Sequence, residues 1–299
     1  MMLRPVGVFF LLVSLSVSLM AQDPNFTLNI NVDLVELQVT VLDHQDRNVP
    51  NLQEADFHIF EDRIEQEIQL FRHEDRPVSL GLIIDNSRSM EQMKDRVDIA
   101  AVSFVRVSNP EDEAFLIHFD DTVRLANDFT ADLSLLENTL DSISPYGQTA
   151  LYDAIIKGLD KMAEGIYDQK AILLVSDGAD NASVQGFLQV LEKIRSSAVP
   201  VYPIGILKDS VSGRRARKAL AEFADVSGGR AFFPQAIDEI PVLTELIARE
   251  LRELYTLGYV PSNARRDGTW RSVRIQVRTP SNTPRYKTNY RHGYYAPEP

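Results

Sequence analysis

Short apolar runs that end in polar turns alternate along the middle of the chain with segments of helical periodicity. Residues 80–84 and 170–175 are apolar runs of this kind, as buried parallel strands are. Residues 92–107 and 151–162 instead repeat apolar side chains every three or four positions, which predicts helices. The alternation predicts an α/β fold with a doubly wound, mostly parallel sheet.

The other elements of this central region fit the same sheet. Apolar residues 114–119 and 123–129 flank a polar turn and predict an antiparallel pair at one edge. Because proline disrupts a strand interior, the strand around Pro200 and Pro203 is expected to start at the first of them or after the second. The remaining predictions are helices over 184–197, 215–224 and 239–255 and strands over 199–206 and 230–234.

Both ends of the chain show a strand pattern instead. Apolar residues alternate between 28 and 41, and again over 272–278. Two further strands, at 57–59 and 68–70, flank a charged segment that is expected to form a hairpin tip, and residues 254–260 form another strand. Because a few strands are marginal alone, we expect the two ends to meet in one β-sandwich-like module. The expected division is 1–21 signal peptide, 22–76 N-terminal β-rich module, 77–254 central domain and 255–299 C-terminal strands.

The start of the chain has the features of a secretory signal. Arg4 precedes the uncharged, apolar residues 5–21, and cleavage is expected after Ala21, with Ser18 as the alternative. An uncleaved anchor is the minority interpretation, because the apolar stretch is short for a membrane span. No later run is long and apolar enough to cross a bilayer, and the chain has no cysteine. The chain is expected to be exported, either secreted or held in the periplasm or cell envelope.

The charge of the chain is unevenly distributed. The formal net charge is −12, which disfavours nucleic acid as a partner. Residues 265–291 nevertheless carry eight Lys or Arg and the single acid Asp267. Two explanations stay open: a solvated edge strand protected by charge, or a stripe that binds polysaccharide or another envelope component. Charge reversal at Arg274 and Arg278 would separate them.

Oxygen-bearing side chains gather where the predicted central strands end. Asp85, Ser87 and Ser89 follow the first apolar run, Asp177 follows the second, and Thr149 opens the helix predicted at 151–162. Because the carboxyl ends of such strands face one crevice, these side chains are expected to meet. Carboxylates and hydroxyls without a nearby imidazole or thiolate suit Mg²⁺ best, with Mn²⁺ or Ca²⁺ as alternatives. Five such ligands leave a coordination position for water or for an acidic group of a partner.

These motifs resemble those of a known family. Asp85, Ser87 and Ser89 in DNSRS, Thr149 in GQTALYDA and Asp177 in VSDG are similar to the metal-ion-dependent adhesion site of von Willebrand factor type A domains. The resemblance covers roughly residues 77–254, and with its β-rich flanks the chain also resembles secreted bacterial proteins that carry a VWFA-related domain. It implies that the two serines and the threonine coordinate the ion, that the aspartates hold it directly or through water, and that a partner carboxylate completes the shell.

The function expected from these patterns is metal-dependent binding of a protein partner, without catalysis. The five histidines are scattered, and neither a nucleophile elbow nor a phosphate-binding glycine loop is present. A Mg²⁺-dependent hydrolase is the less favoured alternative, since it needs a positioned base or a second metal. Asp180 is the candidate base, although a solvent-facing or helix-capping role is expected for it.

Overall fold

The computed structural model describes residues 34–107, 109–178, 180–207, 209–279 and 285–299. The expected signal peptide over 1–21 and the alternating residues Leu28, Ile30 and Val32 lie outside the described residues. Within the described ranges, no helix combines the length and apolar character that a membrane crossing requires.

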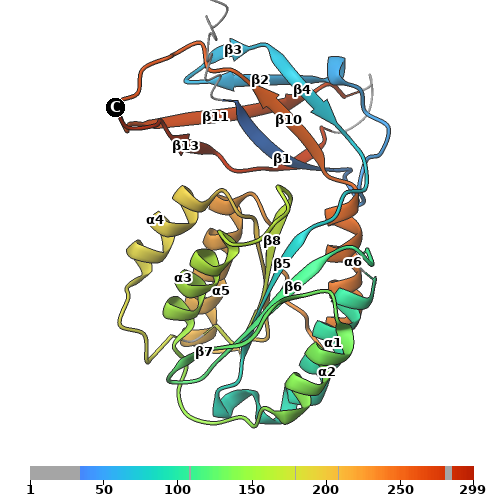
Figure 1. Ribbon diagram of the computed structural model, residues 1–299, viewed down its shortest axis with the longest axis vertical. Helices are drawn as coiled ribbons and strands as arrows, with labels where there is room; N and C mark the ends of the chain where they lie inside the picture. The colour runs from blue at the N-terminus through green and yellow to red at the C-terminus, as the bar shows by residue number, and fades with distance from the viewer. Residues whose placement is uncertain (1–33, 108, 179, 208, 280–284) are drawn as a thin grey trace, which may run out of the picture. The chain divides into compact units, whose positions relative to one another are not determined.

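A five-stranded sheet forms the middle of the central domain (Figure 1). Its strands are β5 (Ser79–Asp85), β6 (Glu113–Phe119), β7 (Val123–Thr130), β8 (Lys170–Ser176) and β9 (Val201–Gly205). Their order is β7-β6-β5-β8-β9, and every neighbouring pair is parallel except β6 and β7. The predicted mostly parallel sheet with one antiparallel edge is confirmed.

Helices cover both faces of this sheet (Figure 1). On β5, Leu82 and Ile84 belong to one apolar core and Ile83 to the other, because successive strand residues point to opposite faces. The first core includes residues of α1 (Lys94–Val107), α2 (Leu133–Ser142) and α6 (Ile240–Arg252). The second includes residues of α3 (Leu151–Met162), α4 (Phe187–Ser197) and α5 (Val211–Ser227). Short 3₁₀ turns precede α1 and α6, as η2 (Arg88–Met93) and η3 (Ile237–Glu239). The domain is therefore doubly wound, as predicted.

Two antiparallel four-stranded sheets form the β-module, which comprises the described residues before 77 and after 254. The strands are β1 (Val35–Leu42), β2 (Phe57–Glu61), β3 (Ile64–Gln66), β4 (Ile68–Arg72), β10 (Tyr255–Tyr259), β11 (Trp270–Val277), β12 (Lys287–Asn289) and β13 (Gly293–Tyr295), with the turn η1 (Glu54–Asp56) before β2. Their orders are β12-β1-β10-β4 and β13-β11-β2-β3. Each sheet mixes strands from both ends of the chain, so the predicted joint module is confirmed. Apolar residues of both sheets share one core, including Leu37, Ile59 and Ile275.

The expected hairpin between the strands at 57–59 and 68–70 is wrong. Asp62 and Arg63 have φ values of 47° and 74° and form a tight turn that pairs β2 with β3. Two left-handed residues in succession suit the twist of a two-residue hairpin. The chain then crosses to the other sheet, where β4 pairs with β10.

The last strands of the central domain also differ from expectation. β9 contains Pro203 in its interior, which is tolerated because β9 lies at the edge of the sheet. Residues 230–234 form no strand. Phe232 makes only an isolated parallel bridge to Ile204.

The observed start of α4 and the observed end of α6 differ from the predicted bounds, because the backbone there bonds groups outside the helix. The amides of Val184 and Gln185 donate to the Asp153 carboxylate, each at 2.9 Å, so α4 begins at Phe187 and not at 184. α6 ends at Arg252 and not at 255, because Tyr255 already pairs with β1.

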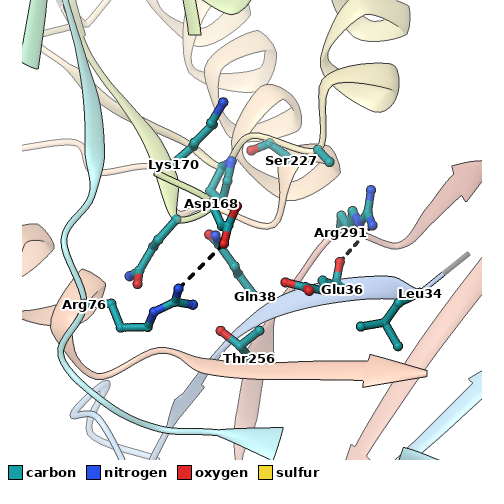
Figure 2. A pocket seen from close by; sticks show the side chains of 12 residues that line it. Leu34, Glu36, Gln38, Arg76, Asp168, Lys170, Ser227, Thr256 and Arg291 are labelled. Carbon is teal, nitrogen blue, oxygen red and sulfur yellow. Dashed lines mark hydrogen bonds and ion pairs between the residues drawn. The ribbon is translucent and has the colours of Figure 1, made fainter. Parts of the chain in front are cut away.

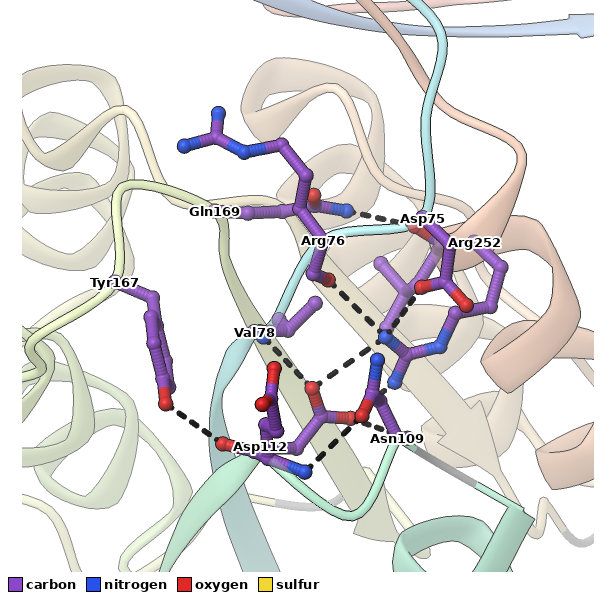
Figure 3. A network of polar contacts seen from close by, with 10 residues as sticks. Asp75, Arg76, Val78, Asn109, Asp112, Tyr167, Gln169 and Arg252 are labelled. Carbon is purple, nitrogen blue, oxygen red and sulfur yellow. Dashed lines mark hydrogen bonds and ion pairs between the residues drawn. The ribbon is translucent and has the colours of Figure 1, made fainter.

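An arginine at the end of α6 ties together the two connections between the central domain and the β-module (Figure 3). Arg252 Nη1 donates to Asp75 Oδ1 at 3.0 Å and to the Arg76 carbonyl at 3.1 Å. Its Nη2 pairs with the buried carboxylate of Asp112, whose Oδ1 also accepts from the Val78 amide at 2.7 Å. The entry into β5 and the exit from α6 are thus held by one ion-pair network.

Candidate metal site

Asp85 is the last residue of β5, and its side chain is only 2% exposed. The Ser87 amide donates to Asp85 Oδ1 at 2.9 Å, and the Ser176 hydroxyl donates to Oδ2 at 2.6 Å. Burial raises the pKa of Asp85 to about 6, with a smaller contribution from the charge of Asp177. The hydroxyl and amide donors act in the opposite direction, because they favour the ionised carboxylate. Asp85 is therefore a buried carboxylate held by neutral groups.

The two serines of the DNSRS motif lie beside Asp85. Ser87 is buried and Ser89 is exposed, and their hydroxyl oxygens are 3.0 Å apart. The 3₁₀ turn η2 begins immediately after Ser87, and its tight winding brings the Ser89 hydroxyl back toward the Ser87 hydroxyl. Two hydroxyl oxygens, one buried and one open to solvent, thus face each other at the end of β5.

Thr149 lies on a neighbouring loop, two residues before the start of α3. Its side chain is buried, its amide donates to Asn181 Oδ1 at 2.9 Å, and its carbonyl accepts from the Asn181 amide at 3.0 Å. The predicted helix has the observed bounds, but its N-cap position is Ala150, so Thr149 does not cap it. The Arg88 amide donates to the Gly147 carbonyl at 3.4 Å, which joins the Thr149 loop to the serine turn.

Asp177 follows β8 and is partly exposed. The residue before it, Ser176, bonds Asp85, and the Gly178 amide donates back to Ser176 Oγ at 2.9 Å. Gly178 has φ +76°, and a Cβ there would lie 2.7 Å from the Ala216 Cβ, so the turn requires glycine. This turn places Asp177 beside Asp85 across the parallel pair β5 and β8.

The structure thus brings Asp85, Ser87, Ser89 and Asp177 together at the carboxyl edge of the sheet, with Thr149 on a loop bonded to both neighbouring loops. Whether these residues bind a metal stays a prediction.

Three positioning residues were not predicted. Ser176 holds Asp85; Asn86 donates from Nδ2 to the Ser144 carbonyl at 2.7 Å; and Asn181 holds Thr149. The role of Ser176 could have been predicted from the sequence, because Ser176 is the last residue of the strand that pairs with β5. The asparagine contacts join loops 32 to 58 residues apart, which no local pattern indicates.

Asp180 bonds the start of α3, which precedes it in the chain, and not the start of the following helix, α4. Its Oδ1 accepts from the Tyr152 amide of α3 at 3.2 Å and from the Ser183 hydroxyl at 2.5 Å. Both contacts tie this carboxylate to the start of α3.

The donor set fits a hard cation. In the described part of the chain, no group of three or more His, Cys, Asp or Glu side chains could hold a metal ion. The predicted site has only two carboxylates, and its remaining donors are hydroxyls, so it is not a group of this kind. Hydroxyl and carboxylate oxygens suit Mg²⁺, Mn²⁺ or Ca²⁺ and not softer ions.

A polar cavity of about 480 Å³ is lined by other residues, among them Glu36, Arg76 and Arg291 (Figure 2). Two of its arginines are engaged within it: Arg76 Nη2 is 3.6 Å from Asp168 Oδ2, and Arg291 Nη2 donates to the backbone carbonyl of Glu36 at 2.8 Å. None of the five predicted ligands lines it. The candidate site thus lies on the loops at the carboxyl edge of the sheet and not in this cavity.

The fold and the loop arrangement define the class of the central domain as a doubly wound α/β domain, with the candidate site at the strand carboxyl ends. Residues 80–179 match the family model of the von Willebrand factor type A domain. The chain therefore contains a von Willebrand factor type A domain. Curated protein sequences gave no match.

Solved structures share this fold at low sequence identity. The von Willebrand factor type A protein from Catenulispora acidiphila is 10% identical, with a TM-score of 0.51 over 91% of this chain and 75% of that one. The vWF domain of the type V pili tip protein Mfa5 from Porphyromonas gingivalis is 13% identical, with a TM-score of 0.50 over 58% and 95%. The PilB minor pilin from Streptococcus sanguinis is 11% identical, with a TM-score of 0.50 over 60% and 62%. This chain thus matches less than two thirds of that pilin, and these likenesses concern the fold alone.

Proposed function

We propose that the protein is an exported binding module that captures a carboxylate of a protein partner through a divalent cation, with Mg²⁺ as the first candidate. In this proposal Asp85, Ser87, Ser89, Thr149 and Asp177 hold the ion. The ion would supply a positive charge that attracts a negative oxygen of the partner.

The observation that carries the proposal is the contrast between Asp85 and the other buried carboxylates of the central domain. Asp112 pairs with Arg252, Asp120 with Arg124 at 2.7 Å, and Glu250 with Arg230 at 3.3 Å. Among the described residues, no Lys, Arg or His forms an ion pair with Asp85. A buried carboxylate without a counter-charge is unfavourable unless a cation is supplied from outside the chain. A divalent ion at this edge would meet that requirement.

The proposed partner chemistry follows from the number of ligands. Two carboxylates and three hydroxyls leave a hard cation short of a full octahedral shell. Ser89 and Asp177 are at least partly exposed, so the site opens to solvent on their side. An Asp, Glu or terminal carboxylate of a partner would complete the shell and neutralise the ion.

We propose binding and not catalysis. Hydrolysis at a single Mg²⁺ needs a positioned general base or a second metal. The candidate base, Asp180, is engaged at the start of α3 by Tyr152 and Ser183. This engagement favours a structural role for Asp180.

Export rests on the sequence of residues 1–21, with Arg4 before an apolar stretch. The fold is also found in proteins named as a minor pilin and a pilus tip protein, which agrees with an adhesive module outside the cytoplasm. Edman sequencing of the protein recovered from an exporting host tests this part, and Gln22 is the expected first residue.

The metal site is tested by calorimetric titration of the protein with Mg²⁺, Mn²⁺ and Ca²⁺. One-to-one binding that disappears in Asp85→Asn is the expected result. Asp120→Asn is the matched control, because Asp120 is equally buried and follows the adjacent strand but pairs with Arg124. Equal binding by the wild type and Asp85→Asn would reject the site.

The open coordination position is tested with Mn²⁺ and ¹³C-labelled acetate. Electron spin echo spectra of the Mn²⁺-loaded protein should show carbon coupling from a directly bound acetate carboxylate. Metal binding without any acetate coupling would leave the site but reject capture of a carboxylate.

A further inference from the structure

The outer face of the sheet β13-β11-β2-β3 presents side chains that the core does not use. Val273 and Ile275 of β11 point into the core of the β-module. Alternation therefore directs Ser272, Arg274 and Gln276 outward, and all three are exposed. This outer face lies in a different domain from the candidate metal site.

An aromatic pair occupies one end of this outer face. Trp270 and Tyr295 are directly opposite each other on β11 and β13, with ring centroids 5.0 Å apart and ring planes at 68°. A Cβ on Gly293 would lie 2.6 Å from Trp270 Cε2, so glycine lets the indole lie against the β13 backbone. Tyr295 is 38% exposed and Trp270 is partly exposed. Hydrogen bonding to Glu192 of α4 raises the pKa of Tyr295. The result is an aromatic pair that is partly open to solvent.

Arg274 lies further along the same strand, with its guanidinium 4.5 Å from the centre of the Phe60 ring. Stacking on an aromatic ring holds the planar guanidinium in place and leaves its N–H groups available. The carboxylate of Glu65, opposite Phe60 on β3, is engaged by His58 at 2.8 Å. Among the ion pairs of the described residues, none involves Arg274.

Protection of an edge strand does not explain the aromatic pair. β11 pairs with β13 over Trp270–Ser272 and with β2 over Val273–Val277, so among the described residues no ladder partner covers its β13 side at Arg274, and the edge-strand explanation stays open for that charge. Trp270 and Tyr295 lie where β13 does cover this side, and they carry no charge. An exposed aromatic pair followed on the same face by an arginine without an ion pair suits a ligand that offers both an apolar ring face and a negative charge.

We propose that this outer face, carrying Trp270, Arg274 and Tyr295, binds an acidic polysaccharide. The C–H face of a pyranose ring would stack on the Trp270 indole, since aromatic faces carry partial negative charge and sugar C–H groups partial positive charge. A uronic acid carboxylate would accept the paired N–H groups of Arg274. Gln276 would donate to or accept from ring hydroxyls, whereas the Ser272 hydroxyl already donates to Asp62 Oδ1 at 3.1 Å. This site needs no metal, so it goes beyond the proposed function and does not depend on it.

The single tryptophan of the chain provides a direct assay. Polygalacturonate is titrated into the protein in EDTA, which prevents any contribution from the candidate metal site, and Trp270 fluorescence is recorded. A saturable change that weakens with added NaCl is the expected result. Dextran, a neutral polysaccharide, should give a much smaller change. No change with polygalacturonate, or an equal response to dextran, would overturn the proposal.

Two variants and a control locate the site. Arg274→Glu should weaken polygalacturonate binding about tenfold or more, since a charge-assisted contact becomes a repulsion. Tyr295→Ala should weaken it while leaving the Trp270 reporter in place. Arg217→Glu is the matched control, because Arg217 is exposed and stacks on Phe233 at 4.1 Å but lies on α5 of the central domain. Equal losses in Arg274→Glu and Arg217→Glu would assign the binding to net charge and reject the site.

Discussion

Replacing Asp85 by asparagine should stabilise the metal-free protein and abolish its response to Mg²⁺. The substitution keeps the size of the side chain and the bond from the Ser87 amide to Oδ1. The new amide NH₂ can donate to Ser176 Oγ, which in the wild type donates to Oδ2 at 2.6 Å. The change therefore removes a buried negative charge and leaves the hydrogen-bonding pattern nearly intact.

The magnitude follows from the pKa of Asp85. Burial raises this pKa from 3.8 to about 6, so the folded protein binds a proton that the unfolded chain releases between these values. The stability contribution of this group is present at low pH and is lost as the pH rises toward and beyond 6. At 1.36 kcal/mol per pKa unit, the ionised carboxylate costs about 3 kcal/mol of folding free energy at neutral pH, as an upper value.

Thermal unfolding by circular dichroism measures this effect. In EDTA at about pH 7.5, Asp85→Asn should melt several degrees above the wild type, since 1 kcal/mol corresponds to roughly 2–4 °C for a domain of this size. At about pH 5 the difference should shrink, because the wild-type carboxyl is then mostly protonated. Saturating Mg²⁺ should raise the melting temperature of the wild type alone. A variant that melts below the wild type in EDTA, or that responds to Mg²⁺, would refute the reasoning.

Three further predictions concern the surroundings of the site. Mg²⁺ affinity, measured by calorimetry, should fall about tenfold per pH unit below the Asp85 pKa of about 6, since the ion must displace a proton there; affinity that is constant down to about pH 4.5 would contradict this. Gly178→Ala should cost about 2 kcal/mol in urea unfolding and weaken Mg²⁺ binding, because it combines a left-handed φ with a clash; an unchanged Kd would show that this turn does not position Asp177. Arg252→Met should cost about 3–5 kcal/mol in the same unfolding assay by leaving Asp112 buried and unpaired. Adding Asp112→Asn should recover part of that loss, and no recovery would exclude the unpaired carboxylate as its cause.

The central domain was predictable because its strands and helices carry strong local patterns. β5 and β8 are apolar throughout and end at polar turns, and α3 has the predicted bounds. The order of motifs along these elements was enough to place Asp85 and Asp177 at one sheet edge. Local pattern and global fold agree here, which is the usual condition for a correct prediction.

Contacts between distant segments were not predictable in the same way. The chain crosses to the other sheet, where β4 pairs with β10, after a two-residue turn at Asp62 and Arg63. Neither residue is a glycine, so the sequence did not indicate a turn with left-handed residues there. β13 is only three residues long and became visible through its pairing with β11. The outer face with Trp270 could therefore not be separated from an edge strand by alternation alone, because alternation reports the face of a strand and not its neighbours.

The two ends of β5 differ in a way that bears on how the candidate site is held. At the start of the strand, the Val78 amide bonds Asp112, which is paired with Arg252, so this end is fixed by a satisfied ion pair. At its other end, Asp85 is ionised only at a cost, because burial raises its pKa. A strand free to shift could move that carboxylate toward water and relieve the cost. β5 is paired with β6 over Ser79–Asp85 and with β8 over Ser79–Ile84 and is anchored at its start, so the strain stays localised at Asp85. Loosening the anchor with Arg252→Met should therefore lower Mg²⁺ affinity even though Arg252 lies at the opposite end of the strand from the predicted ligands.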